Sequence, residues 1–467
     1  MPSKKIERSS KYRIIGAPEV DDNPLLAHLD LPPATDSEAF LALALRPDFQ
    51  IEDASLPAAI RRIRINRLRN FFVPTQPVHR EALIGIGSQV FHGYTHRNPF
   101  TVEGQRRLLG GSIDQPYKPT ISFIAGHSGM GKSTLVDRIL VSLGQQVFHH
   151  NNFQGKAFPE SQILWLRRNL PEHCTVKTLC SAFGEYTDQI LGVPLYEGLF
   201  TSTRAANRDH LISQIRKIIT NHHVGLLVFD EFQNLSLMGV GAEKIIALLV
   251  NLRDELGLPI LIIGTYGSLH LLERSLSTAR RLAEGGYYDL ERPASADNDG
   301  WQQFCKIVWP YQWVHKPVAY NDSICEALYE VSQGIPGIML SVFAKAQLLA
   351  IHSGTESVDA DRIIRVFQDR MKPLHPAVAE LRKSKSHTPN KFDGIYRSTV
   401  KDSAPDETSD TIPSETHSLP VETKPSTVKN RKSATSERQS DGLATSKVRA
   451  KVMNDCPSDI SSAFKTT

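Results

Sequence analysis

The strongest chemical signal in the sequence is a glycine-rich turn that contains a lysine and hydroxyl side chains. Its residues are Gly126, His127, Ser128, Gly129, Met130, Gly131, Lys132, Ser133 and Thr134. Small residues let successive backbone N–H groups turn inward on a β-phosphate, and the N-terminus of the following helix adds partial positive charge. Lys132 would reach the β- and γ-phosphates, and the Ser133 hydroxyl would ligate Mg²⁺. The turn therefore predicts a site for ATP and Mg²⁺.

Two adjacent carboxylates further along the chain supply what hydrolysis needs. The apolar run 225–229 ends in Asp230 and Glu231. Beside a phosphate-binding turn, Asp230 would hold Mg²⁺ through water, and Glu231 would orient and deprotonate the attacking water. A strand that ends in Asp-Glu is by itself compatible with an ordinary helix-capping turn. Together with the upstream turn it favours an ATPase that forms ADP and phosphate.

Three more polar residues are candidates for the reaction. Thr265 follows the next apolar run, 259–263, where the carboxyl ends of parallel strands carry ligands, so its hydroxyl could bond the γ-phosphate or the attacking water. A simple turn residue is the alternative. Arg280 and Arg281 lie near the end of the following helix, from which a guanidinium could reach a γ-phosphate across a subunit boundary. They could equally interact with the helix macrodipole.

Short apolar runs alternate with helical patterns between residues 119 and 290, as in a parallel α/β sheet flanked by helices. The runs are 121–125, 163–166, 226–229 and 259–263, and the helices are expected at 132–143, 176–191, 204–222, 242–256 and 268–283. This arrangement predicts one doubly wound domain, which places the turn and the acids at the carboxyl edge of the sheet.

The chain divides into four parts by pattern. Residues 1–115 form a helical N-terminal extension, and 116–297 form the α/β core. Residues 298–382 show helical periodicity without β-branched runs and predict a small α-helical lid. Residues 383–467 are rich in Ser, Thr, Pro, Lys and Glu, with few large apolar residues, and predict a disordered tail.

A basic helix is expected at 57–72 in the N-terminal extension. Its arginines are Arg61, Arg62, Arg64, Arg67 and Arg69, and they alternate with Ile60, Ile63, Ile65 and Leu68. This spacing predicts one apolar side and a strongly basic remainder. The pattern leaves open whether the basic side is simply solvated or contacts a polyanion or a partner.

Bulk properties indicate a cytoplasmic protein. The chain has 467 residues, of which 40% are apolar, and a net charge of +4. No apolar stretch approaches the roughly 18 residues that a membrane span needs, and the first residues lack the apolar run of a secretory signal. The five cysteines form no close pairs, so reduced thiols are expected. A nucleic-acid surface would have to come from local basic clusters.

Several local signatures occur together in a recognisable order. They are Gly93-Tyr94 before Arg97-Asn98-Pro99, the turn at 126–134, Gln162-Ile163-Leu164-Trp165-Leu166, Phe229-Asp230-Glu231-Phe232-Gln233-Asn234, Gly264-Thr265-Tyr266, Ala279-Arg280-Arg281, and Trp309-Pro310-Tyr311-Gln312-Trp313. From about residue 70 to 382, the chain resembles the TnsC family of transposon target-selection regulators, AAA+ P-loop ATPases related to TniB and MuB.

This resemblance implies an ATP-dependent oligomer on duplex DNA. Family members assemble as rings, hexameric or heptameric, or as helical filaments; a TniQ- or TnsD-like target selector recruits them, and they recruit TnsA- and TnsB-like transposase subunits. By the same analogy, Lys177 and Thr178 would contact DNA, through phosphate-directed and salt-dependent binding. The tail at 383–467 lies outside the resemblance and is open to two interpretations, an unstructured linker or a docking segment for the transposase.

The sequence departs from the family pattern in the lid. A typical AAA+ lid offers an arginine to the nucleotide, whereas residues 332–339 contain none. Two other functions stay open at this point. A helicase loader or replication initiator would predict a dedicated winged-helix or partner domain, which the sequence does not show. A nucleotide-gated scaffold would not bind DNA.

Overall fold

Five parallel strands form the central sheet of the computed structural model, in the order β6-β7-β8-β1-β9. They are β6 (Trp165–Asn169), β7 (Leu226–Asp230), β8 (Ile260–Ile263), β1 (Ile121–Gly126) and β9 (Tyr287–Leu290). Every residue of β1, β7 and β8 is buried, because helices cover both faces of the sheet. This explains why these strands are continuous apolar runs in the sequence.

The structure describes most of the chain before residue 384. The described ranges are 12–108, 119–171, 175–201, 208–238, 240–269, 280 and 284–383. The predicted tail, apart from Lys383, lies outside these residues. Cys180, Cys305 and Cys325 are free thiols, as expected, while Cys174 and Cys456 lie outside the described residues.

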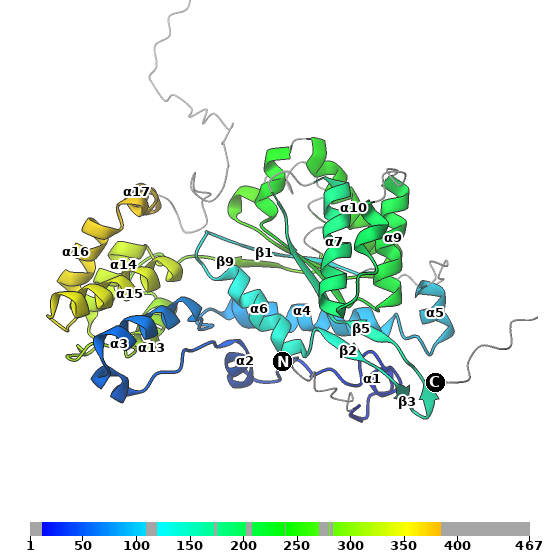
Figure 1. Ribbon diagram of the computed structural model, residues 1–467, viewed down its shortest axis with the longest axis horizontal. Coiled ribbons are helices and arrows are strands. Elements are labelled where there is room, and N and C mark those ends of the chain that lie inside the picture. Colours follow the sequence, from blue (N-terminus) through cyan, green and yellow to red (C-terminus); the bar gives the residue numbers. More distant parts are fainter. Residues whose placement is uncertain are drawn as a thin grey trace, which may run out of the picture. The chain divides into compact units, whose positions relative to one another are not determined.

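Helices pack on both faces of the sheet (Figure 1). One face carries α7 (Val176–Leu191), α9 (Arg208–Asn221) and α10 (Val240–Leu256), and the other carries α4 (Pro77–Thr95) and α6 (Lys132–Leu143). Phe123 belongs to the core on the first face and its neighbour Ile124 to the core on the second, as alternation along a strand requires. The predicted α/β class with a helix-flanked parallel sheet is confirmed.

The helical lid follows the last strand. It contains α13 (Asp299–Val308), α14 (Asp322–Ser332), α15 (Pro336–Ser353), α16 (Ala360–Arg370), the 3₁₀ turn η6 (Lys372–Leu374) and α17 (His375–Lys383). Tryptophans fill its core: Trp301, Trp309 and Trp313 are buried, and Trp309 Nε1 donates to the Val318 carbonyl at 2.6 Å. The Trp309–Trp313 signature of the sequence therefore has a packing role.

Residues 51–76, which we call the N-terminal arm, differ from the expected basic helix. The predicted helix at 57–72 is a short α3 (Ala58–Ile65) followed by the 3₁₀ helix η2 (Asn66–Asn70). The predicted apolar side is confirmed only in part: Ile65 and Leu68 are buried, but Ile63 is 66% exposed and Arg61 is buried. Arg61 is held inside by hydrogen bonds to the carbonyls of Leu56 and Trp313 and by an ion pair with Glu356 of the lid.

Shorter elements complete the N-terminal extension and the surroundings of the sheet. They are α1 (Pro18–Asp21), α2 (Asp36–Leu43), η1 (Ile51–Ser55), α5 (Val102–Leu108), β2 (Val147–His149), β3 (Asn152–Phe153), β4 (Lys156–Ala157), β5 (Ser161–Ile163), α8 (Glu197–Thr201), η4 (Phe232–Met238) and η5 (Tyr266–Ser268). The predicted strand at 163–166 is divided: β5 pairs antiparallel with β2, and only β6 joins the parallel sheet.

The Gly93-Tyr94 and Arg97 signature fixes the start of β7. Tyr94 Oη donates to the His223 carbonyl at 2.7 Å, and Arg97 donates to the Val224 carbonyl at 2.6 Å. A Cβ added to Gly225 would lie 2.5 Å from Tyr94 Oη, so glycine is needed at this close approach. These contacts position the strand that ends in Asp230.

Among the described helices, none is by itself long and apolar enough to cross a membrane. Only α14 and α15 taken together reach the necessary length and composition, across a bend of 115°.

Candidate functional site

The glycine-rich turn connects β1 to α6 and has the backbone conformation that glycine allows. Gly129 and Gly131 both have φ of 86°, in the left-handed region. Space is restricted as well, because a Cβ on Gly129 would lie 2.9 Å from Ile335 Cγ2, and one on Gly131 would lie 3.2 Å from Phe72 Cε2. The loop is therefore enclosed by the lid on one side and by the N-terminal arm on the other.

Lys132 points back into this loop. Its Nζ donates to the carbonyls of Gly126 at 2.8 Å and His127 at 2.9 Å, and the side chain is buried. The ring of His127 meets that of Tyr266 edge-on, with 4.8 Å between centroids. The ammonium group thus lies within the curve of the loop, where the sequence predicts that phosphate oxygens bind.

Ser133 and Asp230 meet across the edge of the sheet, as the sequence predicts for a metal site. Ser133 Oγ donates to Asp230 Oδ2 at 2.9 Å. Asp230 is the last residue of β7 and is only 3% exposed. A hydroxyl and a carboxylate are hard oxygen donors of the kind Mg²⁺ prefers, so this pair fits the ion.

Arg167 is a residue of the site that the sequence interpretation missed. It lies on β6, next to β7, and donates to Asp230 Oδ2 at 2.6 Å and to Asp137 of α6. The Arg167 side chain is 17% exposed. The available signal was an arginine within a strand that pairs with the apolar strand ending in Asp230, because a cation there needs a carboxylate partner.

Glu231 adopts a backbone conformation that is rare for its residue type. Its φ is 58°, and its N–H donates to Asp230 Oδ1 at 2.8 Å. Such a conformation costs on the order of 1–3 kcal/mol and is common at functional sites. The Gln233 amide donates to Glu231 Oε2, while the carboxylate stays exposed. The strained turn directs Glu231 out of the sheet, where a water molecule can reach it.

Thr265 is connected to the same group of residues. Its N–H donates to Gln233 Oε1 at 3.2 Å, so one glutamine amide joins Glu231 and Thr265. Thr265 Oγ1 is buried and has no hydrogen-bond partner in the part of the chain that the structure describes. A buried hydroxyl without a partner is unusual and is consistent with a group that bonds a ligand.

Comparison with known proteins agrees with this geometry. A family model described as an AAA domain matches residues 115–272, which contain the loop, both acids and Thr265. The matched region includes four of the five sheet strands, with the loop at the end of β1. The fold is that of an AAA+ P-loop NTPase.

Solved structures similar to the chain include three ORC proteins. They are the ORC2 protein of Aeropyrum pernix in ADPNP and ADP complexes (13% identity, TM-score 0.40, 65% of this chain and 71% of that chain), the ORC1 protein of Aeropyrum pernix in complex with DNA (16%, 0.38, 56% and 62%), and Drosophila ORC bound to DNA (14%, 0.39, 72% and 70%). No curated protein matches the chain. Similarity at this level supports no inference about function.

A cavity opens beside the P-loop of the AAA+ domain. It has a volume of about 220 Å³ and is lined by residues of the P-loop, the lid and the N-terminal arm. Phe72, His79, Gly129 and Thr134 are among its lining residues. Burial lowers the pKa of His79 to about 4, so this imidazole is neutral at pH 7. Apolar side chains and the cation of Arg69 line this cavity together, a combination that suits a nucleotide.

The lid touches the P-loop of the AAA+ domain directly. The N–H of Gly337, at the start of α15, donates to the Gly129 carbonyl at 3.0 Å. The start of α15 therefore lies directly against the P-loop.

The remaining predicted residues are not brought to the P-loop by the described contacts. Arg280 is 70% exposed and lies 3.7 Å from Glu284, and Arg281 lies outside the described residues. At the start of α7, the Thr178 hydroxyl donates to the Thr175 carbonyl at 3.0 Å and so takes part in helix capping. Lys177 beside it is exposed.

Proposed function

We propose that this AAA+ protein binds and hydrolyses ATP and uses the nucleotide to control its assembly on duplex DNA. The observation that carries the proposal is the convergence of Lys132, Ser133, Asp230 and Glu231 at one edge of the sheet. Binding alone would not need a carboxylate in the strained position of Glu231. The coarser conclusion, an AAA+ ATPase domain, rests on the family model as well.

The chain's own groups divide the work of hydrolysis. Lys132 binds the β- and γ-phosphate oxygens after leaving the loop carbonyls, and the loop N–H groups bind the β-phosphate. Ser133 and Asp230 would hold Mg²⁺, which supplies positive charge to the phosphate oxygens. Glu231 takes a proton from the attacking water as the new P–O bond forms and the bond to the ADP oxygen breaks. The Thr265 hydroxyl orients the γ-phosphate or that water.

Assembly on DNA is the second part of the proposal. Arg280 or Arg281 would reach the γ-phosphate of an adjacent subunit, which suits the exposed position of Arg280. Lys177 would bind a DNA phosphate, and the hydroxyl of Thr178 would contribute if the helix cap opens. The oligomer would be a ring or a helical filament of six or seven subunits per turn.

We further propose a role in DNA transposition, on the motifs that resemble the TnsC family. Residues 1–115 would contact a TniQ- or TnsD-like target selector, 116–297 would be the ATPase core, and 298–382 the lid. The tail at 383–467 would dock TnsA- or TnsB-like transposase subunits. ATP binding would load the protein onto the target DNA, and hydrolysis would release it.

The test compares the wild type with Glu231→Gln and Lys132→Ala. Fluorescent ATP binding, phosphate release and anisotropy of labelled duplex DNA are measured on the same samples. Glu231→Gln should bind ATP, lose about 10²–10⁴-fold in turnover, and stay on DNA after wild type has dissociated. Lys132→Ala should not bind ATP.

The outcomes separate the other functions. DNA binding that is the same with and without ATP contradicts a nucleotide switch. Absence of DNA binding in every nucleotide state indicates a scaffold. For the transposition role, a reconstituted strand-transfer reaction should need both this protein and ATP; loading of a replicative helicase instead would indicate an initiator.

A further inference from the structure

The lid turn that touches the P-loop leaves little room for a side chain at Gly337. A Cβ added to Gly337 would lie 3.0 Å from the Gly129 carbonyl oxygen and 3.2 Å from Gly129 Cα. The same residue is bonded to that carbonyl through its N–H. At position 337 the close contact with Gly129 disfavours a side chain, and residues 332–339 contain no arginine. A cation for the nucleotide would therefore come from another element.

The N-terminal arm carries five arginines, and most are already neutralised. Three form ion pairs: Arg61 with Glu356, Arg64 with Asp53, and Arg67 with Asp48. Among the described residues, Arg62 and Arg69 have no ion pair and no side-chain hydrogen bond. These two therefore keep an available guanidinium.

Arg69 differs from Arg62 in where it lies. Arg69 lines the cavity beside the P-loop and also a neighbouring cavity of about 350 Å³ against the lid. The two cavities share Arg69, Gly337 and Leu340, whereas Lys345 lines only the second. Arg69 is thus common to both cavities, and the loop glycines Gly129 and Gly131 line the first of them.

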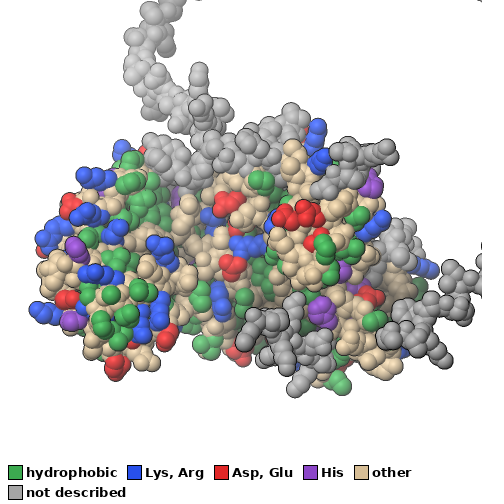
Figure 2. Space-filling model, in the orientation of Figure 1, with side chains coloured by type: hydrophobic (Ala, Val, Ile, Leu, Met, Phe, Trp, Pro, Cys, Tyr) green, Lys and Arg blue, Asp and Glu red, His purple; other side chains and the backbone are tan. Residues whose placement is uncertain are grey.

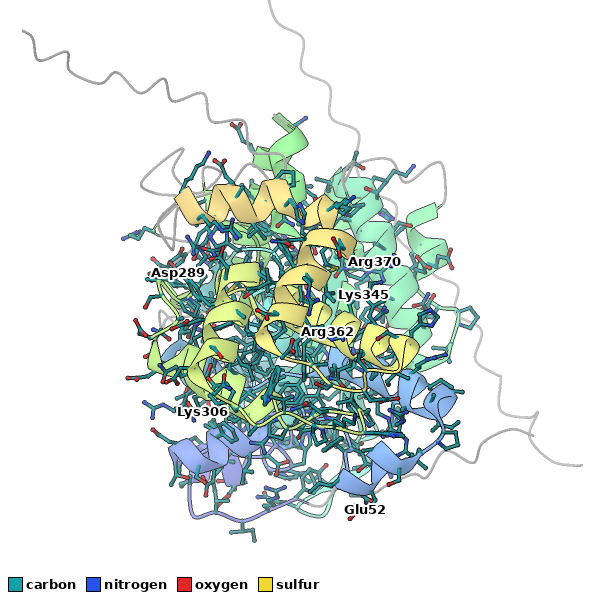
Figure 3. The ribbon with its side chains drawn as sticks, turned by 90° about the vertical axis from the view of Figure 1, so that its left-hand side faces the viewer. Glu52, Asp289, Lys306, Lys345, Arg362 and Arg370 are labelled. Carbon is teal, nitrogen blue, oxygen red and sulfur yellow. The ribbon has the colours of Figure 1, made fainter. Side chains whose placement is uncertain are left out.

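The charge around these two cavities is positive. Within the described part of the chain, no Asp or Glu lines either cavity. Lys and Arg side chains gather over the end of the molecule formed by the lid and the N-terminal arm (Figure 2). Lys345, Arg362 and Arg370 are further basic side chains of the lid helices α15 and α16 (Figure 3). A guanidinium without a carboxylate, beside a phosphate-binding loop, is complementary to phosphate oxygens.

We propose that Arg69 binds the phosphate chain of the nucleotide, and so supplies from the N-terminal arm of the same subunit the cation that the lid lacks. This proposal rests on the proposed nucleotide site. It makes the arm part of the ATPase: movement of η2 relative to α6 would change nucleotide affinity.

The experiment measures equilibrium binding of fluorescent ATP and ADP, with Mg²⁺, to full-length Arg69→Ala, Arg69→Lys and wild type. Arg69→Ala should bind both nucleotides about tenfold more weakly, which corresponds to about 1.4 kcal/mol. Arg69→Lys should recover part of the loss, because it keeps the charge but not the planar fork. Thermal unfolding without nucleotide should be unchanged, since Arg69 is exposed and has no described partner.

Two matched controls distinguish an effect of the position of Arg69 from a general effect of removing one positive charge. Arg62→Ala removes an exposed arginine of the same arm that lines neither cavity, and Lys345→Ala removes a cation from the neighbouring cavity only. Both should bind nucleotide like wild type. Equal binding by Arg69→Ala and wild type, or equal losses in all three variants, would overturn the proposal. If Lys132→Ala also binds like wild type, the nucleotide site itself is wrong.

Discussion

Arg167 donates a 2.6 Å hydrogen bond to Asp230 Oδ2, the same oxygen that accepts the Ser133 hydroxyl at 2.9 Å. One carboxylate therefore serves both a fixed cation and the proposed metal site. The second N–H group of Arg167 binds Asp137, so the guanidinium is held between β7 and α6. Its charge lowers the attraction of Asp230 for another cation.

Arg167→Gln should lower the Mg²⁺ concentration needed for half-maximal ATP binding, by about three- to tenfold, because the competing charge is removed. A titration of Mg²⁺ at fixed fluorescent ATP measures this. Arg168→Gln is the control, since Arg168 lies 3.8 Å from Glu185 and over the Tyr186 ring, away from Asp230. A higher Mg²⁺ requirement in Arg167→Gln would show that Arg167 supports the metal instead of competing with it.

Thr265→Val should leave the free energy of unfolding nearly unchanged but lower the rate of ATP turnover. Valine keeps the shape of threonine and removes a buried hydroxyl that has no partner among the described residues. The free energy of unfolding should stay within about 0.5 kcal/mol or rise. Turnover should fall at least about tenfold, because the ligand loses a hydrogen bond. Urea unfolding and phosphate release test the two parts, and normal turnover would make Thr265 a turn residue only.

Arg61→Ala should destabilise the fold by about 3–5 kcal/mol, because it leaves Glu356 and two carbonyls without their buried partner. Arg62→Ala, on the adjacent exposed position, should change the free energy of unfolding by no more than about 0.5 kcal/mol. Denaturant titrations of both variants give the values. Similar small effects would mean that the arm does not brace the lid.

Acid should destabilise the protein through buried histidines. Burial lowers the pKa of His28 to about 3 and that of His79 and His150 to about 4, while an unfolded histidine titrates near 6.5. The unfolded chain therefore takes up protons first, so this stability is complete above pH 6.5 and is lost as the pH falls toward 4. Each histidine contributes about 1.4 kcal/mol per pH unit in that range.

Urea midpoints measured at pH 7.5, 6.5 and 5.5 give the slope of stability with pH. Below pH 6.5, His28→Gln should reduce the slope of the unfolding free energy with pH by the contribution of one histidine, about 1.4 kcal/mol per pH unit. A wild-type midpoint that is constant across this range would contradict the assigned burial.

The sheet and its phosphate loop could be predicted because each rests on local pattern. The helices at 132–143 and 176–191 have the predicted bounds, since strong amphipathic periodicity determines them locally. β9 was not predicted: it is a short edge strand in which Tyr287 is exposed, so its sequence lacks an apolar run. Its place in the sheet depends on pairing with β1.

The limits of the sequence interpretation were set by long-range partners. Nothing near Arg167 indicates that it meets Asp230, and nothing near Arg61 indicates that Glu356 of the lid will bury it. Periodicity alone predicted Arg61 on the basic side and Ile63 on the apolar side, whereas Arg61 is buried and Ile63 is 66% exposed. The phosphate loop could be predicted from the sequence because the residues that form it are consecutive.

Calorimetric titration of full-length protein with Mg²⁺ and ATP tests the central claim most directly. Wild type should bind one nucleotide per chain, and Lys132→Ala, which removes the ammonium group held over the loop carbonyls, should lose measurable binding while remaining folded. Wild-type protein that takes up no nucleotide, or a Lys132→Ala variant that binds it with undiminished affinity, would contradict the account.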